Sequence, residues 1–297
     1  MMKSKPSSRN LVRRGLLFSI FITFLLILGC SSSITPTYLK EDIPQAIHDI
    51  LKKEYNIEIK ARLIGRTIWI YLPVEELFEK AQKPEKYTEK FMVKQNECKL
   101  ETGSLKVQYA INVIPQEEKA QDVKYRKEVA EQINNVWGVV RRVLFSMKCL
   151  KTQEPQFIYL VIADIKSGFE IRQLSYYQDL KKVSYNFIST GEYHHRTVQD
   201  INFLPQLIGD KEGAYLKYID FSLEDFVTQQ IQYRLKLKFQ KPEVEQNADI
   251  DKEVMKIVVY TIKTYGLKDF DEAQLNNLAT NNKVSLSRAA IWARPTD

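Results

Sequence analysis

Apolar positions along the chain follow helical and strand periods in turn. Helical spacing predicts helices from about residue 42, over about 120–147, from residue 222 to about 239, and from residue 250 to Gly266. A period of two predicts strands at 57–63, 105–114 and 156–165, while TIWIYL (67–72) is apolar on both faces, as in a covered central strand. Weaker patterns predict a helix over 174–189 and strands at 193–202 and 214–221. Residues 79–104, which include KPEKYTEK, are polar and are expected to be irregular.

These elements predict an α/β (α+β mixed) fold. It is a mixed sheet with an N-terminal hairpin turning at Gly65-Arg66, a βαβ unit, and additional C-terminal helices. The βαβ unit would consist of strand 105–114, helix 120–147 and strand 156–165, with a right-handed crossover. QKPEVEQNAD (240–249) is the best linker candidate. We therefore expect a mixed domain over 39–240 and a helical C-terminal extension over 241–297, packed on that domain, whose tail adds an edge strand.

The first thirty residues have a different organisation. MMKSKPSSRNLVRR carries five basic residues and no acidic one, and GLLFSIFITFLLIL follows it. This apolar run is shorter than the ~20 residues of a spanning helix, and the order is typical of a secretory signal peptide. The run leads into Ile27-Leu28-Gly29-Cys30. An aliphatic residue, a tolerant position, a small residue and a cysteine together resemble the lipobox of bacterial lipoproteins.

The resemblance implies both proteolytic processing and a cellular location. Residues 1–29 would be a signal peptide that is removed, and Cys30 would receive a diacylglycerol and an N-acyl chain. Residues 30–38 would then be a lipidated tether in the bacterial cell envelope. Ser31 favours the outer membrane, facing the periplasm, where the cell has two membranes. The expected partners are the membrane, through this lipid, and an envelope protein. The alternative is an uncleaved signal anchor with an incidental cysteine.

Processing changes what the net charge of +7 means. Five of the 44 basic residues precede Cys30, which leaves 39 against 37 acidic residues. The remaining charges are interspersed, as in EEKAQDVKYRKE, and this pattern is typical of a solvated surface. The sequence therefore argues against nucleic-acid binding.

Cys98 and Cys149 remain as a pair once Cys30 is lipidated. An envelope compartment permits disulfides. If the helix at 120–147 runs back over the sheet that contains strand 105–114, its end brings Cys149 near Cys98. The sequence thus predicts a Cys98–Cys149 disulfide, with two buried free thiols as the alternative.

Candidate chemistry is sparse. GEYHHR (191–196) holds His194 and His195, which would point to opposite faces of a strand and more often form a polar surface pair. Asp164 ends a strand, where ligands bind in α/β sheets, although it could simply cap the following turn. We find no HExxH, Cys–His pair, GxSxG, P-loop or GxGxxG in the sequence, so we predict no metal site and no cofactor.

Three functions remain open. The favoured one is a membrane-anchored, non-enzymatic binding or scaffold module of the envelope. The second is an envelope hydrolase, which requires Asp164 to lie within about 10 Å of His194 or His195, because proton transfer needs hydrogen-bond reach. The third is a carrier of a small apolar ligand, which requires a cavity along the helix-facing side of the sheet.

Overall fold

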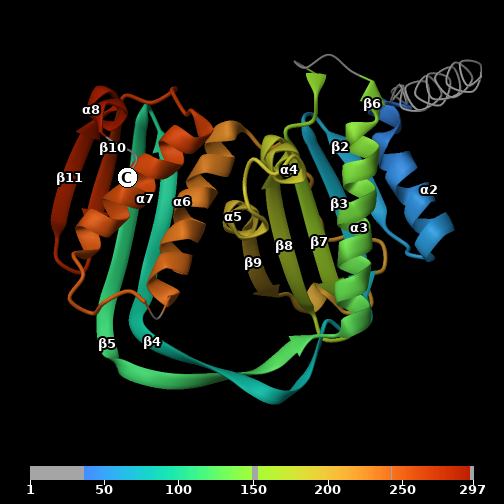
Figure 1. Cartoon of the computed structure of the whole chain (residues 1–297), viewed down its shortest axis with the longest axis horizontal. Coiled ribbons are helices and arrows are strands. Elements are labelled where there is room, and N and C mark those ends of the chain that lie inside the picture. The colour runs from blue at the N-terminus through green and yellow to red at the C-terminus, as the bar shows by residue number, and fades with distance from the viewer. Residues whose placement is uncertain (1–36, 149–152, 242, 295–297) are drawn as a thin grey trace, which may run out of the picture. The chain divides into compact units, whose positions relative to one another are not determined.

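A computed structural model describes residues 37–148, 153–241 and 243–294 (Figure 1). The chain divides into two compact units, residues 1–37 and 38–297, and the second holds every element described below. The fold class is the predicted one, since helices alternate with strands along the chain and the strands form three sheets. Cys30 and the residues before it that resemble a lipobox lie outside the described residues.

The first sheet has five strands. In spatial order they are β2 (Lys60–Ile64), β3 (Thr67–Val74), β7 (Phe157–Asp164), β8 (Phe169–Tyr176) and β9 (Val198–Phe203). β3 and β7 are parallel, and the other pairs are antiparallel. The predicted hairpin is confirmed: Ile64 pairs with Thr67, and Gly65 has φ +56°, the left-handed region required at the first position of a II′ turn. TIWIYL is the central, doubly covered strand that its composition predicts.

Both faces of this sheet are covered. One face packs on α2 (Ile43–Tyr55), α3 (Lys127–Phe145) and α4 (Tyr177–Ser184), as Figure 1 shows. α2 begins after Asp42, as predicted, and buries Ile43, Ile47 and Leu51 completely. The other face packs on the segment 204–221, which includes η3 (Pro205–Leu207), and on α6 (Leu223–Gln240). A short parallel pair, β1 (Tyr38–Leu39) with β6 (Met147–Lys148), lies at the end of α3, and η1 (Lys40–Asp42) follows β1.

The second sheet has four strands. In spatial order they are β11 (Asn282–Ser287), β10 (Glu272–Asn277), β5 (Ser104–Tyr125) and β4 (Phe78–Glu101). α6 and α7 (Ile250–Tyr265) cover one of its faces, and α8 (Arg288–Ala293) follows β11. The predicted start of α6 at residue 222 is confirmed, with a capping box of Ser222 and Asp225, and so is the end of α7 at Gly266, which has φ +67°. The predicted edge strand is β11, so residues 241–297 add two strands besides helices.

Residues 79–104 are not irregular, and this prediction is wrong. They belong largely to β4, which pairs with β5 in a long two-stranded ribbon that extends from the four-stranded sheet towards the base of the five-stranded one (Figure 1). The half near the turn at Thr102-Gly103 alternates between buried residues and residues that are half-buried or exposed. The distal half is exposed on both faces. Its sequence therefore lacks the apolar alternation that would reveal a strand, and this half of β4 is a strand because it pairs with β5.

The predicted βαβ unit has the wrong first strand. Strand 105–114 belongs to β5 and strand 156–165 to β7, and these lie in different sheets. The parallel partner of β7 is β3, so the unit is β3–α3–β7 with the β4–β5 ribbon inserted after β3. Periodicity identifies a strand but not the sheet that it joins, because pairing partners are set by distant segments.

Three local predictions also change. The helix expected over 174–189 begins only at Tyr177, because the preceding residues complete β8. The strand expected at 193–202 begins at Val198, because Thr190–Arg196 form the short helix α5, which the Ser189 side chain caps by accepting from Glu192 N at 3.0 Å. Residues 214–221, all within the described part of the chain, form turns and coil that pack on the sheet face.

α6 connects the two sheets. Near its start the Phe226 ring packs on Phe157 of β7 at 5.4 Å between centroids and on Tyr176 of β8 at 5.7 Å. Near its end the Phe239 ring meets Phe91 of β4 edge-on at 5.3 Å. The larger of two buried cores is therefore continuous from one sheet to the other.

Candidate functional site

Asp164 is a structural residue rather than a free carboxylate. It is 2% exposed at the end of β7, and its Oδ2 accepts a hydrogen bond from Leu77 N at 2.9 Å. Its Oδ1 accepts from the backbone N–H groups of Lys166 at 3.1 Å and Ser167 at 2.7 Å. Three backbone donors bind the carboxylate, and two of them come from the turn after β7, so Asp164 caps the strand-to-loop turn.

The two histidines lie on α5, not on a strand. His194 is exposed, while His195 faces a cavity of about 380 Å³ between α5, α6 and α7. Burial and the charge of Lys241 lower the pKa of His195. Both carboxylates of this cavity are already paired within it: Glu192 with Arg234 at 3.3 Å, and Glu253 with Lys238 at 2.8 Å. The cavity thus holds two paired carboxylates, four basic side chains and an imidazole whose pKa is lowered.

Asp164 and the histidines do not share a site. Across the sheet, Tyr159 pairs with Leu174 and Leu174 pairs with Val198, so the start of β9 is level with Tyr159. Asp164 lies five residues further along β7, which is about 17 Å at ~3.3 Å per residue. His195 precedes β9 and lies beyond that end of the sheet. This arrangement argues against the hydrolase hypothesis, because the separation exceeds the reach of proton transfer.

The predicted disulfide also loses its basis. Cys98 is buried on β4 with a free thiol, and Cys149 lies outside the described residues. The prediction assumed that helix and strand shared one sheet, yet α3 packs on the five-stranded sheet and Cys98 in the core beside the four-stranded one. Burial raises the pKa of the Cys98 thiol well above its usual range.

A buried ion network ties α4 and α5 to α6. Arg196 Nη1 donates to Asp179 Oδ1 at 3.0 Å, and these side chains are 10% and 1% exposed. Arg196 Nε donates to Glu192 Oε1 at 2.7 Å, and Gln230 Nε2 of α6 donates to the Arg196 carbonyl at 2.6 Å. Burial alone would lower the pKa of Arg196, but Glu192 and Asp179 hold it above its usual range. The network is charge-paired and structural.

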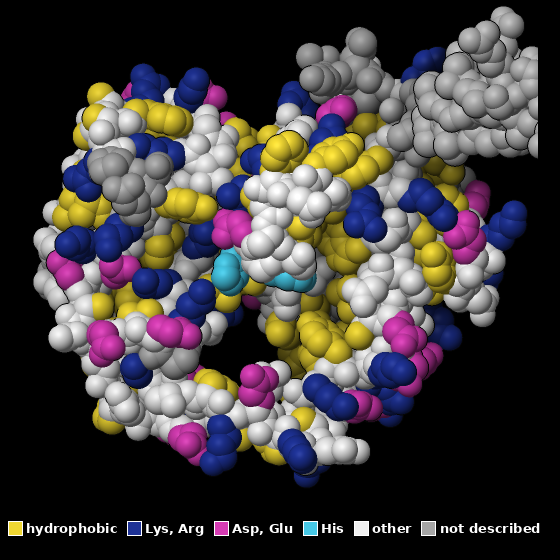
Figure 2. All heavy atoms as spheres, in the orientation of Figure 1, with side chains coloured by type: hydrophobic (Ala, Val, Ile, Leu, Met, Phe, Trp, Pro, Cys, Tyr) yellow, Lys and Arg dark blue, Asp and Glu magenta, His cyan; other side chains and the backbone are white. Residues whose placement is uncertain are grey.

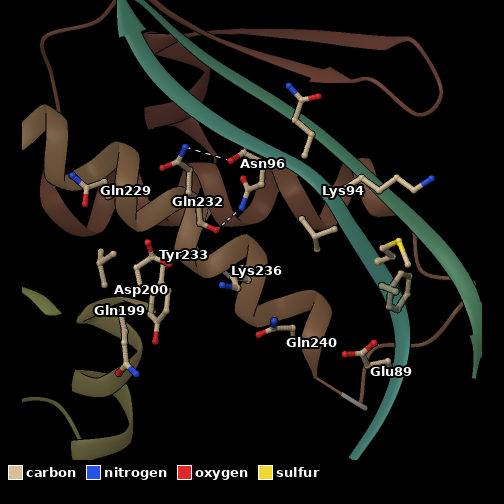
Figure 3. Close-up of a pocket in the computed structure, with 15 residues that line it drawn as sticks. Glu89, Lys94, Asn96, Gln199, Asp200, Gln229, Gln232, Tyr233, Lys236 and Gln240 are labelled. Atoms are coloured by element: carbon tan, nitrogen blue, oxygen red, sulfur yellow. Dashed lines mark hydrogen bonds between the residues drawn. The ribbon is translucent and has the colours of Figure 1, made fainter. Parts of the chain in front are cut away.

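The strongest candidate site is a groove of about 480 Å³ between the two sheets (Figure 3). α6 forms its floor, β4 one wall and β9 the other; we call it the inter-sheet groove. Its lining comes from β4 (Glu89, Phe91, Met92, Val93, Lys94, Gln95, Asn96), β9 (Val198, Gln199, Asp200) and α6 (Gln229, Gln232, Tyr233, Lys236, Gln240). Its volume is within the range of ~300–1,000 Å³ typical of ligand sites. On the face in Figure 2 the surface is hollowed between α6, β9 and the ribbon.

Amide side chains dominate the chemistry of the inter-sheet groove. Asn96 Nδ2 donates to the Gln232 carbonyl at 2.6 Å, and Gln232 Nε2 donates to the Asn96 carbonyl at 3.4 Å, which fixes β4 against α6. Asn96 Oδ1 is buried and has no partner among the described residues. Two acidic and two basic residues balance the lining charge. Such a surface both donates and accepts hydrogen bonds and has no net charge, which suits a neutral polar ligand.

The two walls are the edges of two different sheets. β4 ends the four-stranded sheet and β9 ends the five-stranded sheet, so each has one side without a neighbouring strand. The pairing of β4 with β5 shifts register between Glu89 and Phe91 and again between Val93 and Gln95, along this wall. Edge strands present backbone N–H and C=O groups that an added strand can pair with.

One signal for this site is present in the sequence of α6. Gln229, Tyr233, Lys236 and Gln240 recur at helical spacing in α6 and therefore share one polar face. The walls could not be recognised, because β4 was expected to be irregular and β9 to begin at residue 193.

Comparisons with protein-family models, curated proteins and solved structures find no match to this chain. Among the described residues, no cluster of three or more histidine, cysteine, aspartate or glutamate side chains has the arrangement of a metal site. Within the same residues, helices long and apolar enough to cross a membrane are absent.

Proposed function

We propose that the chain is a lipid-anchored lipoprotein of the bacterial cell envelope that acts as a non-enzymatic binding module. In this proposal the inter-sheet groove binds an extended, uncharged segment of an envelope partner protein. One observation carries the assignment: two sheet edges and an amide-rich helix face line the same groove.

The address rests on the N-terminal sequence. A basic stretch, a short apolar run and Ile27-Leu28-Gly29-Cys30 stand in the order of a lipoprotein signal peptide. Acylated Cys30 would hold the chain at the membrane, since each buried methylene contributes about 0.8 kcal/mol and stable anchoring needs more than one chain. Ser31 favours the outer membrane where the cell has two.

The ligand class follows from the groove. An extended peptide carries a backbone donor and acceptor at each residue, and an open strand edge supplies matching groups. Amide side chains from α6 can satisfy the opposite side of such a peptide. Two carboxylates and two amines leave the lining without net charge, which disfavours phosphate-rich or strongly acidic ligands.

The carrier hypothesis receives less support. It requires a cavity on the helix-facing side of the sheet, where Ile158, Leu160 and Ile162 of β7 are each fully buried against α2 and α3. The volumes described above have mixed or charged linings, which suit polar contacts better than an apolar ligand.

The address is tested with the full chain and a Cys30→Ser variant in cells fed a labelled fatty acid. We expect label and membrane fractionation in the first and neither lipid nor cleavage in the second. An unlabelled chain of full mass beginning at Met1 would contradict the lipoprotein assignment.

The groove is tested by crosslinking in intact cells followed by purification of the full chain from membranes. Gln229→Lys places a charge on the groove floor, and Gln274→Lys places the same charge on the exposed side of β10. We expect the first to lose a protein partner that the second retains. Equal recovery with both variants, or recovery of a glycan in place of a protein, would overturn the assignment.

A further inference from the structure

Three large apolar side chains lie exposed around the end of α4 and the β1–β6 pair. Phe187 is 78% exposed, Tyr185 63% and Leu39 54%. We call this group of two aromatic rings and one leucine the aromatic patch. Phe187 has the highest exposure of the large apolar residues in the described part of the chain. On the face in Figure 2, hydrophobic side chains gather over α4. An exposed group of this kind marks an interaction surface more often than an isolated apolar residue does.

The fold holds the patch in place. Asn186 has φ +59°, and its N–H donates to the Val183 carbonyl at 3.2 Å. The Phe187 N–H donates to the Lys182 carbonyl at 2.8 Å, so the chain reverses tightly after α4. The Tyr185 ring stacks on Phe145 of α3 with 5.9 Å between centroids and 7° between planes. The rings therefore project from a hydrogen-bonded turn packed on a helix rather than from an unsupported loop.

The tether enters the fold beside this patch. Tyr38 N donates to the Ser146 carbonyl at 3.3 Å, and Tyr38 pairs with Met147. Ser146 directly follows Phe145, on which Tyr185 stacks. Cys30 precedes Tyr38 by only eight residues, which span at most about 28 Å when fully extended. A lipid on Cys30 thus keeps this side of the fold within reach of the bilayer.

Basic residues accompany the rings. Lys148 is exposed at the end of β6, and Lys181 and Lys182 stand in the last turn of α4, before Tyr185. Lys181 pairs with Glu154 at 2.8 Å and Lys182 with Asp179 at 3.3 Å. Aromatic rings with nearby lysines are enriched where proteins meet the headgroup region, because the rings bury apolar area while amines remain among phosphates.

We propose that the aromatic patch docks the folded unit onto the headgroup region of the bilayer that carries the Cys30 lipid. This inference rests on the lipoprotein address of the proposed function and adds an orientation to it. Docking would fix which end of the five-stranded sheet faces the membrane. The end that carries Phe203 would point away, because Phe203 lies five residues along β9 from the end near α5.

The test places the photoreactive residue p-benzoylphenylalanine at position 187 of the full chain, in cells whose phospholipids are labelled. The matched control has the same residue at position 203, because Phe203 is also an aromatic, is 57% exposed and contacts another exposed ring, Phe169. We expect phospholipid adducts from position 187, at least several-fold more than from position 203. Position 185 gives a second, independent measurement of the same surface.

Each outcome has a defined meaning. Equal lipid labelling at 187 and 203, no lipid adduct at 187 or 185, or a protein adduct in place of lipid would each overturn docking. Fatty-acid labelling of Cys30 and membrane flotation are measured in the same samples. A chain that is acylated and floats without a lipid adduct at 187 overturns the docking alone, whereas an unacylated chain overturns the proposed function.

Discussion

The two large sheets differ in how they meet their surroundings. β7, at the centre of the five-stranded sheet, is buried at all eight residues, because helices cover one face and α6 with the 204–221 segment covers the other. β5, at the centre of the four-stranded sheet, alternates, because α6 and α7 cover only one face. The first sheet is thus open mainly at its two edges, and the second at its two edges and one face.

The difference shows where binding is possible. Parallel strands are normally covered on both faces, and β3 and β7 obey that rule, so the centre of the five-stranded sheet offers a ligand no face. The five-stranded sheet ends in β2 and β9 and the four-stranded sheet in β11 and β4, and the edges that line the groove are β9 and β4. Because α6 packs against both sheets, it holds these two edges on either side of one groove.

Alanine substitutions at neighbouring positions would test the difference in coverage. Phe157→Ala and Ile158→Ala on β7 face opposite sides, and both residues are fully buried. We expect each to lower the free energy of unfolding, by about 3–5 and 2–5 kcal/mol. On β5, Ile111→Ala should cost about 2–5 kcal/mol and Asn112→Ala within ~0.5 kcal/mol. Denaturant titrations measure all four, and a large cost for Asn112→Ala would contradict the one-sided coverage.

The buried ion network that ties α4 and α5 to α6 can be broken at Arg196. Arg196→Leu leaves the carboxylate of Asp179, 1% exposed, without its main partner, so we expect a loss of about 3 kcal/mol or more. The control is Arg142→Leu, whose 2.8 Å pair with Glu54 is solvent-exposed and should cost no more than ~1 kcal/mol. Similar denaturant midpoints for both variants would show that the network does not contribute to the free energy of unfolding.

Acid should weaken the same junction. Burial acts to raise the pKa of Glu192, but hydrogen bonds from Arg196 and Tyr260 and the charge of Arg234 outweigh it, so that pKa lies below its usual value. Its contribution to stability is present above the unfolded-state pKa and is lost as pH falls through the folded-state pKa. As the pH falls below the ordinary pKa of a glutamate, the native chain should therefore lose more stability than Glu192→Gln. The free energy of unfolding of both chains is measured against pH, and an equal loss in the two would contradict this prediction.

The smallest expected effect concerns Cys98. Because burial raises the pKa of its thiol and the thiolate is the reactive form, the native chain should label slowly with maleimide at this position. Lys94→Cys, exposed on the same strand, should label quickly. Peptide mass mapping distinguishes these sites, and the detection of a Cys98–Cys149 disulfide would instead restore the pairing expected from sequence.

Local signals in the sequence predicted local structure well. Gly65-Arg66 marked a hairpin, Ser222 with Asp225 marked the start of α6, and Gly266 marked the end of α7, because each requirement lies within a few residues. The distal half of β4 escaped prediction for the opposite reason. Exposed on both faces, it has no alternation, and only pairing with β5 makes it a strand.

Sheet membership and the candidate site depend on contacts distant in sequence. One of the three donors to Asp164, Leu77 N, comes from a loop 87 residues away, so the sequence around Asp164 does not show that both of its carboxylate oxygens have partners. The inter-sheet groove joins Asn96 to Gln232 across 136 residues. No local pattern contains that information, although the polar face of α6 marked one side of the site.

Photocrosslinking from the groove walls in intact cells tests the central claim most directly. The photoreactive residue is placed at Met92 on β4, at Asp200 on β9, and at Gln274 on the open face of the four-stranded sheet. We predict that the two groove positions capture the same envelope protein, joined through one contiguous segment of it, and that position 274 does not. Capture of that protein equally from position 274, or of no protein from either groove wall, would contradict the account.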